Sequence, residues 1–229
     1  MSLTKIACVG EGSLRGGGFQ TKPKEQVLKS IVLRGYADAA VDLIEAYEAV
    51  SSAELFAPVR EHLPSRPVQV LDIGAGTGRD AAWFAAQSHR VLAVEPVDAL
   101  RNAGMARHWC SRLSWIKDTL PELSQTLALG AKFDLIVLSA VWHHLDRDER
   151  EAAFPVLRLL ASDGGKVVMS LRHGPGVQSR PVYPVRASDT EALATRSGFA
   201  KLGETHTPSA QKHNQTSGVT WTWLVFQAA

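Results

Sequence analysis

Val70-Leu71-Asp72-Ile73-Gly74-Ala75-Gly76-Thr77-Gly78-Arg79-Asp80 is the stretch that decides the fold of this 229-residue chain. An apolar run typical of a buried strand stops at three glycines, each separated from the next by one residue. Glycine has no Cβ atom, so it permits a tight turn and lets backbone amides approach a ligand closely. The stretch therefore predicts a strand over residues 68–73, a ligand-binding turn, and a helix that begins near Arg79.

A second short strand, predicted over residues 90–94, ends at Glu95. An acidic side chain at this place can accept hydrogen bonds from both ribose hydroxyls of an adenosine. A solvated helix cap is the alternative interpretation of Glu95. The glycines depart from the G-x-G-x-x-G pattern of dinucleotide enzymes, because the third glycine arrives one residue early.

The glycine turn, together with Ala93-Val94-Glu95-Pro96, resembles the class I S-adenosylmethionine-dependent methyltransferases, and the likeness extends over about residues 68–227. It implies an α/β fold, a Rossmann-like three-layer αβα sandwich. The sheet is expected to have seven strands, mostly parallel, with an antiparallel C-terminal hairpin. The alternation of strands and helices after Pro67 independently predicts a mostly parallel sheet with right-handed crossovers.

The chain divides into three segments. Residues 1–24 combine five glycines with polar and basic residues and show no periodicity, which predicts a flexible tail. Within them, the motif from Gly10 to Gly16 imitates a dinucleotide fingerprint but has no amphipathic helix after it. Residues 25–66 show helical periodicity and are expected to form an N-terminal lid, or else to cover a sheet edge. Residues 67–229 form the expected S-adenosylmethionine-binding domain.

Composition limits the classes of partner. The formal charge of +2, without a dense Lys/Arg block, gives no indication of a nucleic-acid or membrane surface. Only two cysteines occur, Cys8 and Cys110, and neither a disulfide framework nor a cysteine zinc site is indicated. Without a secretion signal or a long apolar run, the chain is expected in the cytoplasm. The oligomeric state is left open, a homodimer included.

The resemblance implies a set of cofactor-binding residues. Asp72 is expected to support the glycine loop and the ammonium group of S-adenosylmethionine, and Glu95 to bind the ribose. Asp118, after a third strand, corresponds to the acid that accepts from the adenine amino group, although Asp before Thr-Leu-Pro is also a natural turn or helix cap. The full set is Asp72, Gly74, Ala75, Gly76, Glu95, Pro96, Asp118, Thr119 and Ser139.

The segment after the fourth strand, residues 139–145, lies where this family carries residues of the methyl-transfer site. His143 and His144 are candidates for a general base, because imidazole titrates near neutral pH. The alternative is that each only shapes the loop. No third ligand of suitable spacing accompanies them, so no metal site is expected. The candidate substrate-binding residues are Tyr36, Trp142, His144, Arg172 and Arg180, with the arginines suited to an acidic group.

These observations predict an enzyme that transfers a methyl group from S-adenosylmethionine to a small-molecule acceptor and releases S-adenosylhomocysteine. Nucleic-acid amino methyltransferases carry Asn/Asp-Pro-Pro-Tyr/Phe after the fourth strand, where this chain has Ser139-Ala140-Val141-Trp142. Two alternatives stay open. One is a non-catalytic protein that binds the cofactor as a sensor or partner subunit, and the other is a nicotinamide oxidoreductase.

Overall fold

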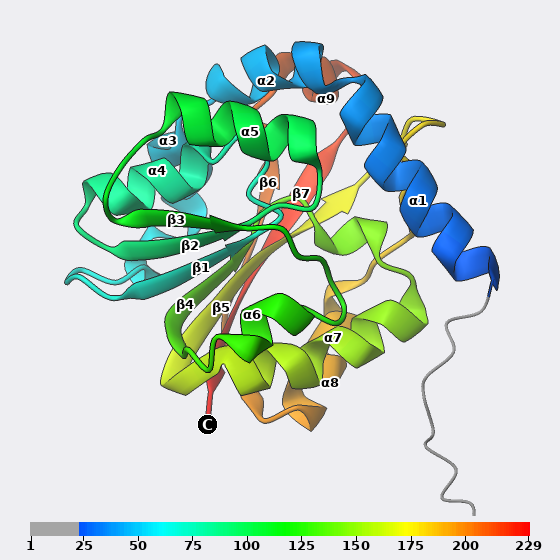
Figure 1. Ribbon diagram of the computed structural model, residues 1–229. Helices are drawn as coiled ribbons and strands as arrows, with labels where there is room; N and C mark the ends of the chain where they lie inside the picture. Colours follow the sequence, from blue (N-terminus) through cyan, green and yellow to red (C-terminus); the bar gives the residue numbers. More distant parts are fainter. Residues whose placement is uncertain (1–22) are drawn as a thin grey trace, which may run out of the picture.

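The protein is built on a seven-stranded sheet of order β3-β2-β1-β4-β5-β7-β6 (Figure 1). The computed structural model describes residues 23–229, with side chains from Lys29 onward. Strands β1 to β5 run parallel, and β7 pairs antiparallel with both β5 and β6, which confirms the predicted topology. The strands are β1 (Gln69–Ile73), β2 (Arg90–Val94), β3 (Leu113–Ile116), β4 (Phe133–Leu138), β5 (Ala161–His173), β6 (Phe199–Pro208) and β7 (Thr220–Ala228).

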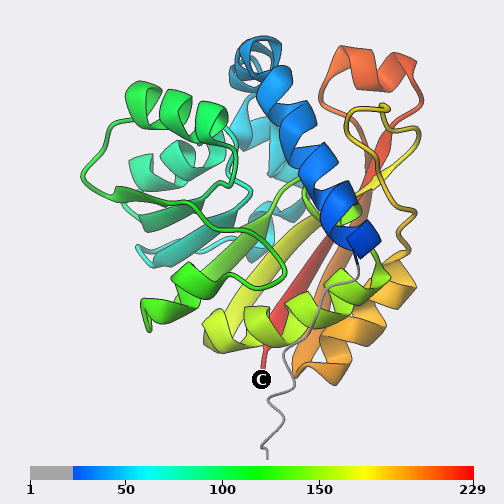
Figure 2. The ribbon, with the colours of Figure 1, turned by 45° about the vertical axis from the view of Figure 1, so that its right-hand side comes forward.

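Helices cover both faces of the sheet, so that three layers result (Figures 1 and 2). Helices α3, α4 and α5 lie on one side, and α6, α7 and α8 lie on the other. None of the helices within residues 23–229 has the length and apolar character needed to cross a membrane. The helices after the first strand are α4 (Arg79–Ala86), α5 (Asp98–Arg107), α6 (Ser124–Ala128), α7 (Arg147–Leu160), α8 (Ala187–Arg196) and α9 (Lys212–Thr216).

Alternating side chains of the central strands fill the two apolar layers. In β1, Leu71 and Ile73 pack with Phe154 of α7, whereas Val70 packs with Phe84 of α4. Strands enclosed on both faces are apolar on both sides, as parallel sheets require. This packing fixes the direction of β1. The glycine turn therefore lies at the edge of the sheet that is formed by the carboxyl ends of the parallel strands.

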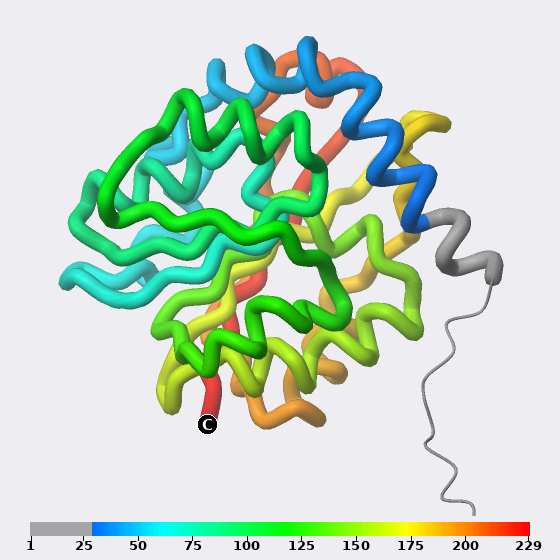
Figure 3. The backbone as a smooth tube through the Cα atoms, in the orientation of Figure 1, coloured from blue at the N-terminus to red at the C-terminus, as the bar shows by residue number. Residues whose placement is uncertain are grey.

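The N-terminal segment folds into helices α1 (Pro23–Asp38), α2 (Ala40–Glu48) and α3 (Ser52–Leu55), followed by the 3-10 helix η1 (Ala57–His62). Figure 3 shows this segment passing beside α5 before the chain enters β1, and both α1 and α2 contact α5. Of the predicted tail, only Pro23 and Lys24 belong to the described residues, and both lie in α1. The glycine motif between residues 10 and 16 lies outside the described residues.

The sequence predicts the fifth strand over residues 166–171, and β5 is longer than this. It begins at Ala161 rather than at Lys166, and its pairing with β4 shifts register beyond Phe133. Gly164 has a positive φ of 72°, and a Cβ at Gly165 would lie 2.9 Å from the carbonyl oxygen of Phe133. The two glycines therefore form an irregularity inside the strand.

Candidate functional site

The turn after β1 is held open by glycine backbone and fastened to β2. Gly74, Gly76 and Gly78 have positive φ angles of 71°, 58° and 77°. The amides of Gly74 and Ala75 both donate to the carbonyl oxygen of Val94, at 2.8 and 3.0 Å. A Cβ at Gly74 would collide with Val141, so both backbone conformation and space require glycine there.

Two buried carboxylates flank this turn. Asp72 is 2% exposed and Glu95 is 4% exposed, and they lie at the ends of adjacent strands. Oδ2 of Asp72 has no hydrogen-bond partner. Burial, and then the negative charge of Asp80, raises the pKa of Asp72 well above its ordinary value. An unpaired buried carboxylate oxygen is costly, and a cationic group beside it would remove that cost.

Glu95 is bonded to backbone amides on both sides. Its Oε2 accepts from the amide of Gly76 and its Oε1 from the amide of Val97, each at 2.8 Å. Burial raises the pKa of Glu95 to about 7, against the opposing effect of those two hydrogen bonds and of the charge on Arg101. Each carboxylate oxygen can accept more than one hydrogen bond, so Glu95 retains capacity for hydroxyl donors. Pro96, the next residue, is half-buried.

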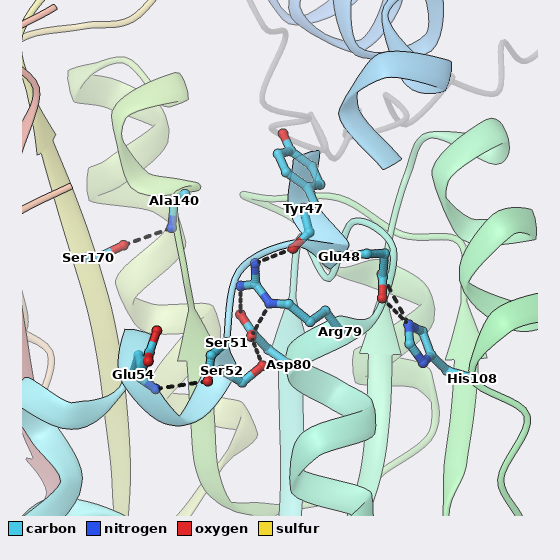
Figure 4. Close-up of polar contacts among 10 residues, drawn as sticks. All are labelled: Tyr47, Glu48, Ser51, Ser52, Glu54, Arg79, Asp80, His108, Ala140 and Ser170. Atoms are coloured by element: carbon cyan, nitrogen blue, oxygen red, sulfur yellow. Dashed lines mark hydrogen bonds and ion pairs between the residues drawn. The ribbon is translucent and has the colours of Figure 1, made fainter. Parts of the chain in front are cut away.

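An ion pair at the start of α4 connects the N-terminal helices to the glycine turn (Figure 4). The Nε and Nη2 atoms of Arg79 donate to the two carboxylate oxygens of Asp80, both at 2.8 Å. Nη1 of Arg79 donates to the carbonyl oxygen of Tyr47 at 2.9 Å, and Oγ of Ser52 donates to Asp80 at 2.7 Å. These bonds fix the end of α2 and the start of α3. The ring of Tyr47 lies close to the glycine turn, since a Cβ atom placed on Gly76 would be 3.6 Å from it. No sequence pattern indicates the contact between Tyr47 and the glycine turn.

The loop after β4 is oriented from β5. Oγ of Ser170 accepts a hydrogen bond from the amide of Ala140 at 2.8 Å (Figure 4), and Ala140 has a positive φ of 59°. Ser139 precedes Ala140, and Trp142 follows it two residues later. Trp142 is fully buried against Phe154, with ring centroids 5.1 Å apart, and as folded it offers no surface to a ligand.

His144 joins the N-terminal helix to this loop. Its Nδ1 lies 3.0 Å from the carbonyl oxygen of Pro181, which can only accept, so Nδ1 carries the proton. Nε2 then accepts from the hydroxyl of Tyr36 at 2.7 Å. Burial lowers the pKa of His144 to about 4, and the charges of Arg180 and Arg172 contribute in the same direction. His144 is therefore neutral at pH 7, with its free lone pair used by Tyr36.

His143 occupies a different environment. It is 3% exposed, its Nδ1 has no hydrogen-bond partner, and its ring lies between His144 and Trp221 at centroid distances of 4.2 and 5.8 Å. Burial lowers the pKa of His143 well below its ordinary value, and proximity to His144, Arg172 and Arg150 acts in the same direction. Both histidines thus lie at the predicted place, both neutral, and only His143 has an unused ring nitrogen.

Asp118 lies at the end of β3, but its carboxylate binds its own chain. Oδ1 accepts from the amide of Thr119 at 2.9 Å, and Oδ2 accepts from the amide and hydroxyl of Thr126 at 2.8 and 2.9 Å. The hydroxyl of Thr119 donates to the carbonyl oxygen of Leu120. These contacts are those of the turn or helix cap that the sequence left as the alternative for Asp118.

A cavity of about 390 Å³ adjoins the loop after β4. Its wall includes Ser139, Ala140, Ser170, Trp221 and Trp223, and the remainder comes from α3, η1, the end of β6, the segment that follows β6, and α9. Indole rings and hydroxyl groups together suit a small molecule with an apolar body and a few polar atoms. A second hollow of about 310 Å³, near Gln69 and Asp134, lies at the amino ends of the strands and away from the glycine turn.

Tyr36→Phe is expected to loosen α1. The change removes one buried hydrogen bond and leaves Nε2 of His144 without a donor, which should cost about 1 kcal/mol and increase local opening roughly fivefold. Hydrogen–deuterium exchange of residues 23–38 would measure it. Arg34→Gln, on the exposed side of the same helix, is the matched control. Equal exchange in wild type and Tyr36→Phe would show that this hydrogen bond does not hold the helix.

Comparison with known proteins defines first the class of fold. The chain superimposes with a TM-score of 0.72 on 1,6-didemethyltoxoflavin-N1-methyltransferase of Burkholderia thailandensis, crystallised with 1,6-didemethyltoxoflavin and S-adenosylhomocysteine, at 21% identity over 93% of each chain. With magnesium protoporphyrin IX methyltransferase of Synechocystis, the TM-score is 0.59 at 15% identity, covering 96% of this chain and 87% of the other. The fold is that of class I S-adenosylmethionine-dependent methyltransferases.

The sequence comparisons add the family. Residues 70–165 match the family model described as a methyltransferase domain. An uncharacterized methyltransferase of Alkaliphilus oremlandii is 27% identical over 106 residues, which is 44% of each protein. Residues 70–165 of this chain thus match a methyltransferase domain, as the resemblance of the glycine turn predicted.

Proposed function

We propose that this protein transfers a methyl group from S-adenosylmethionine to a small-molecule acceptor. The observation that carries the proposal is the pair of buried carboxylates, Asp72 and Glu95, on either side of the glycine turn. A diphosphate at this turn would lie beside the unpaired carboxylate oxygen of Asp72, whereas an adenosyl group that carries an amino acid brings a cation to it. Glu95 is suited to the ribose hydroxyls of either ligand, so Asp72 makes the distinction. This argument disfavours a nicotinamide cofactor.

The chain's own residues fit that ligand. The unpaired Oδ2 of Asp72 would accept from the ammonium group, and the bare backbone of residues 74–76 would pass beside the methionine part. Glu95, with Pro96 beside it, would receive the ribose hydroxyls. Asp118 and Thr119 are proposed near the adenine because they end β3, and Ser139 is proposed at the reacting side because it follows β4.

When bound, S-adenosylmethionine supplies an already activated methyl group, so the main task of the protein is to place the acceptor in line. Ser170 sets the position of residues 139–140, and the adjacent cavity provides space for the acceptor. Tyr36 and Tyr47 lie over the turn from the N-terminal helices and would exclude water. The similar solved structures include enzymes named for toxoflavin-type, porphyrin and glycopeptide acceptors, which supports a small-molecule substrate.

His144 is proposed as a general base only for a state in which Tyr36 has released its Nε2. His144 can accept a proton from a substrate after the hydroxyl of Tyr36 leaves its Nε2, and the lowered pKa makes it a weak base even then. His143 has an unused nitrogen but is almost fully enclosed. An acceptor whose nucleophilic atom is unprotonated at neutral pH would need neither residue.

The test has two stages. Calorimetric titration should show binding of S-adenosylhomocysteine and none of NAD. The protein should then convert S-adenosylmethionine to S-adenosylhomocysteine in the presence of at least one member of a mixed panel of heterocycles, phenols and amines. Preference for NAD would refute the cofactor assignment. Tight cofactor binding without turnover on any acceptor would favour the non-catalytic sensor over the enzyme.

A further inference from the structure

Two arginines stand beside the proposed methyl-transfer site without an acidic partner. Arg172 lies in β5 and Arg180 in the loop that follows it. Among the ion pairs of the described residues, neither arginine occurs. Arg79, by contrast, holds both oxygens of Asp80. A guanidinium without a carboxylate at a ligand site is suited to bind an anion.

Arg180 has an unmet hydrogen-bond donor. Its Nε is buried and has no partner, and its guanidinium carbon lies 5.2 Å from the centre of the Tyr36 ring. In Arg150, by comparison, each guanidinium nitrogen donates to an acceptor within the protein. Its Nε, Nη1 and Nη2 donate to the carbonyl oxygens of Trp142, Pro184 and Tyr183. Arg180 differs because a buried N–H is left for a ligand.

Arg172 reaches the same place from the strand. It shares its face of the sheet with Ser170, two residues earlier, and is opposite Trp221 in the strand pairing. Its Nη1 donates to the carbonyl oxygens of Gly174 and Pro175. Burial lowers the pKa of Arg172, Tyr36 opposes that effect, and the charge of Arg180 lowers it further. The two cations therefore repel each other, and an anion between them would relieve that repulsion.

Glu95 does not supply this anion. Glu95 influences the pKa of both Tyr36 and Tyr47, but its two oxygens accept from the amides of Gly76 and Val97. His144 is neutral and donates only to Pro181. The surroundings of the arginines are thus tyrosine rings, a neutral imidazole and backbone carbonyls.

We propose that Arg180, together with Arg172, forms a binding site for a carboxylate group of a ligand, beneath Tyr36 and beside His144. The proposal rests on the proposed function in one respect: the carboxylate belongs either to the amino-acid part of the cofactor or to an acidic acceptor. The two sources share the same recognition chemistry, a forked hydrogen bond from guanidinium to carboxylate.

The first arm of the test examines the cofactor's carboxylate. S-Adenosylhomocysteine and its decarboxylated analogue, S-adenosyl-3-thiopropylamine, are titrated calorimetrically into wild type, Arg180→Gln and Arg186→Gln. Arg186 is an exposed arginine in the same connecting segment and serves as the control. If the cofactor supplies the anion, Arg180→Gln loses about tenfold or more affinity for S-adenosylhomocysteine, and its affinity for the analogue stays the same.

The second arm examines an acidic acceptor in the wild-type protein, and Arg180→Gln is needed only to assign one resonance. The Nε–H resonance of Arg180, assigned by its absence in Arg180→Gln, is followed in ¹⁵N spectra before and after saturation with S-adenosylhomocysteine, and then with each probe added to the saturated protein. Sodium benzoate and neutral benzamide serve as probes. A shift with benzoate and not with benzamide assigns the site to the acceptor.

The outcomes separate the two proposals. Absence of S-adenosylhomocysteine binding contradicts the proposed function. If S-adenosylhomocysteine binds with equal strength to wild type and Arg180→Gln, and the Arg180 resonance responds to neither S-adenosylhomocysteine nor benzoate, the carboxylate site is refuted while the proposed function stands.

Discussion

Asp72→Asn is expected to lose about 1.5–3 kcal/mol of S-adenosylhomocysteine binding while it flattens the pH dependence of stability. The binding loss follows because the proposed partner of the ammonium group loses its charge. The stability effect follows because the folded-state pKa of Asp72 is raised well above 3.8. For such a group, the free energy of unfolding falls as the pH rises above 3.8, and the variant lacks that decline.

Denaturant unfolding between pH 4 and pH 8 would compare the two proteins, with Asp163→Asn as the control. Asp163 is 94% exposed and lies outside the site. A wild type and an Asp72→Asn variant with parallel stability curves would show that Asp72 carries no raised pKa. Unchanged affinity for S-adenosylhomocysteine would remove Asp72 from the cofactor site.

Glu95→Gln is expected to produce the second large effect, centred on neutral pH. The pKa of Glu95 is raised from 4.5 to about 7 in the folded protein. The wild type should therefore lose up to about 3 kcal/mol of stability as the pH rises from 4.5 through 7, and the variant should not. Cofactor affinity should show the opposite trend in the wild type and rise through pH 7, because the ionised carboxylate accepts from the ribose more strongly.

Glu61→Gln, at an 83% exposed side chain, is the control for this experiment. Calorimetric titration at pH 6, 7 and 8 gives the affinity, and urea unfolding gives the stability. If affinity in Glu95→Gln remains within twofold of wild type at pH 8, Glu95 does not bind the ribose.

The features that the sequence predicts well are those encoded by neighbouring residues. The apolar run before Gly74 predicts the first strand and its end, and Glu95 marks the end of the second strand. The topology follows because parallel strands require crossover connections. The sequence does not predict that residues 161–165 belong to β5, and the reason is physical. Asp163-Gly164-Gly165 has the composition of a turn, but pairing with β4 draws it into the sheet as an irregular strand.

The part of the site that could not be predicted depends on contacts between distant residues. Tyr36 and His144 are 108 positions apart, and Ser170 and Ala140 are 30 positions apart. No local pattern indicates either pair. Asp118 is different, because residues close to it in sequence donate the hydrogen bonds that its carboxylate accepts.

The ion pair at the start of α4 restricts how three positions of the sequence can change during evolution. One carboxylate, that of Asp80, satisfies both Arg79 and Ser52. Loss of Asp80 alone would leave a guanidinium and a hydroxyl without their acceptor in a largely water-free place. Positions 52, 79 and 80 are therefore expected to change together among homologous proteins, and an alignment in which they vary independently would contradict that covariation.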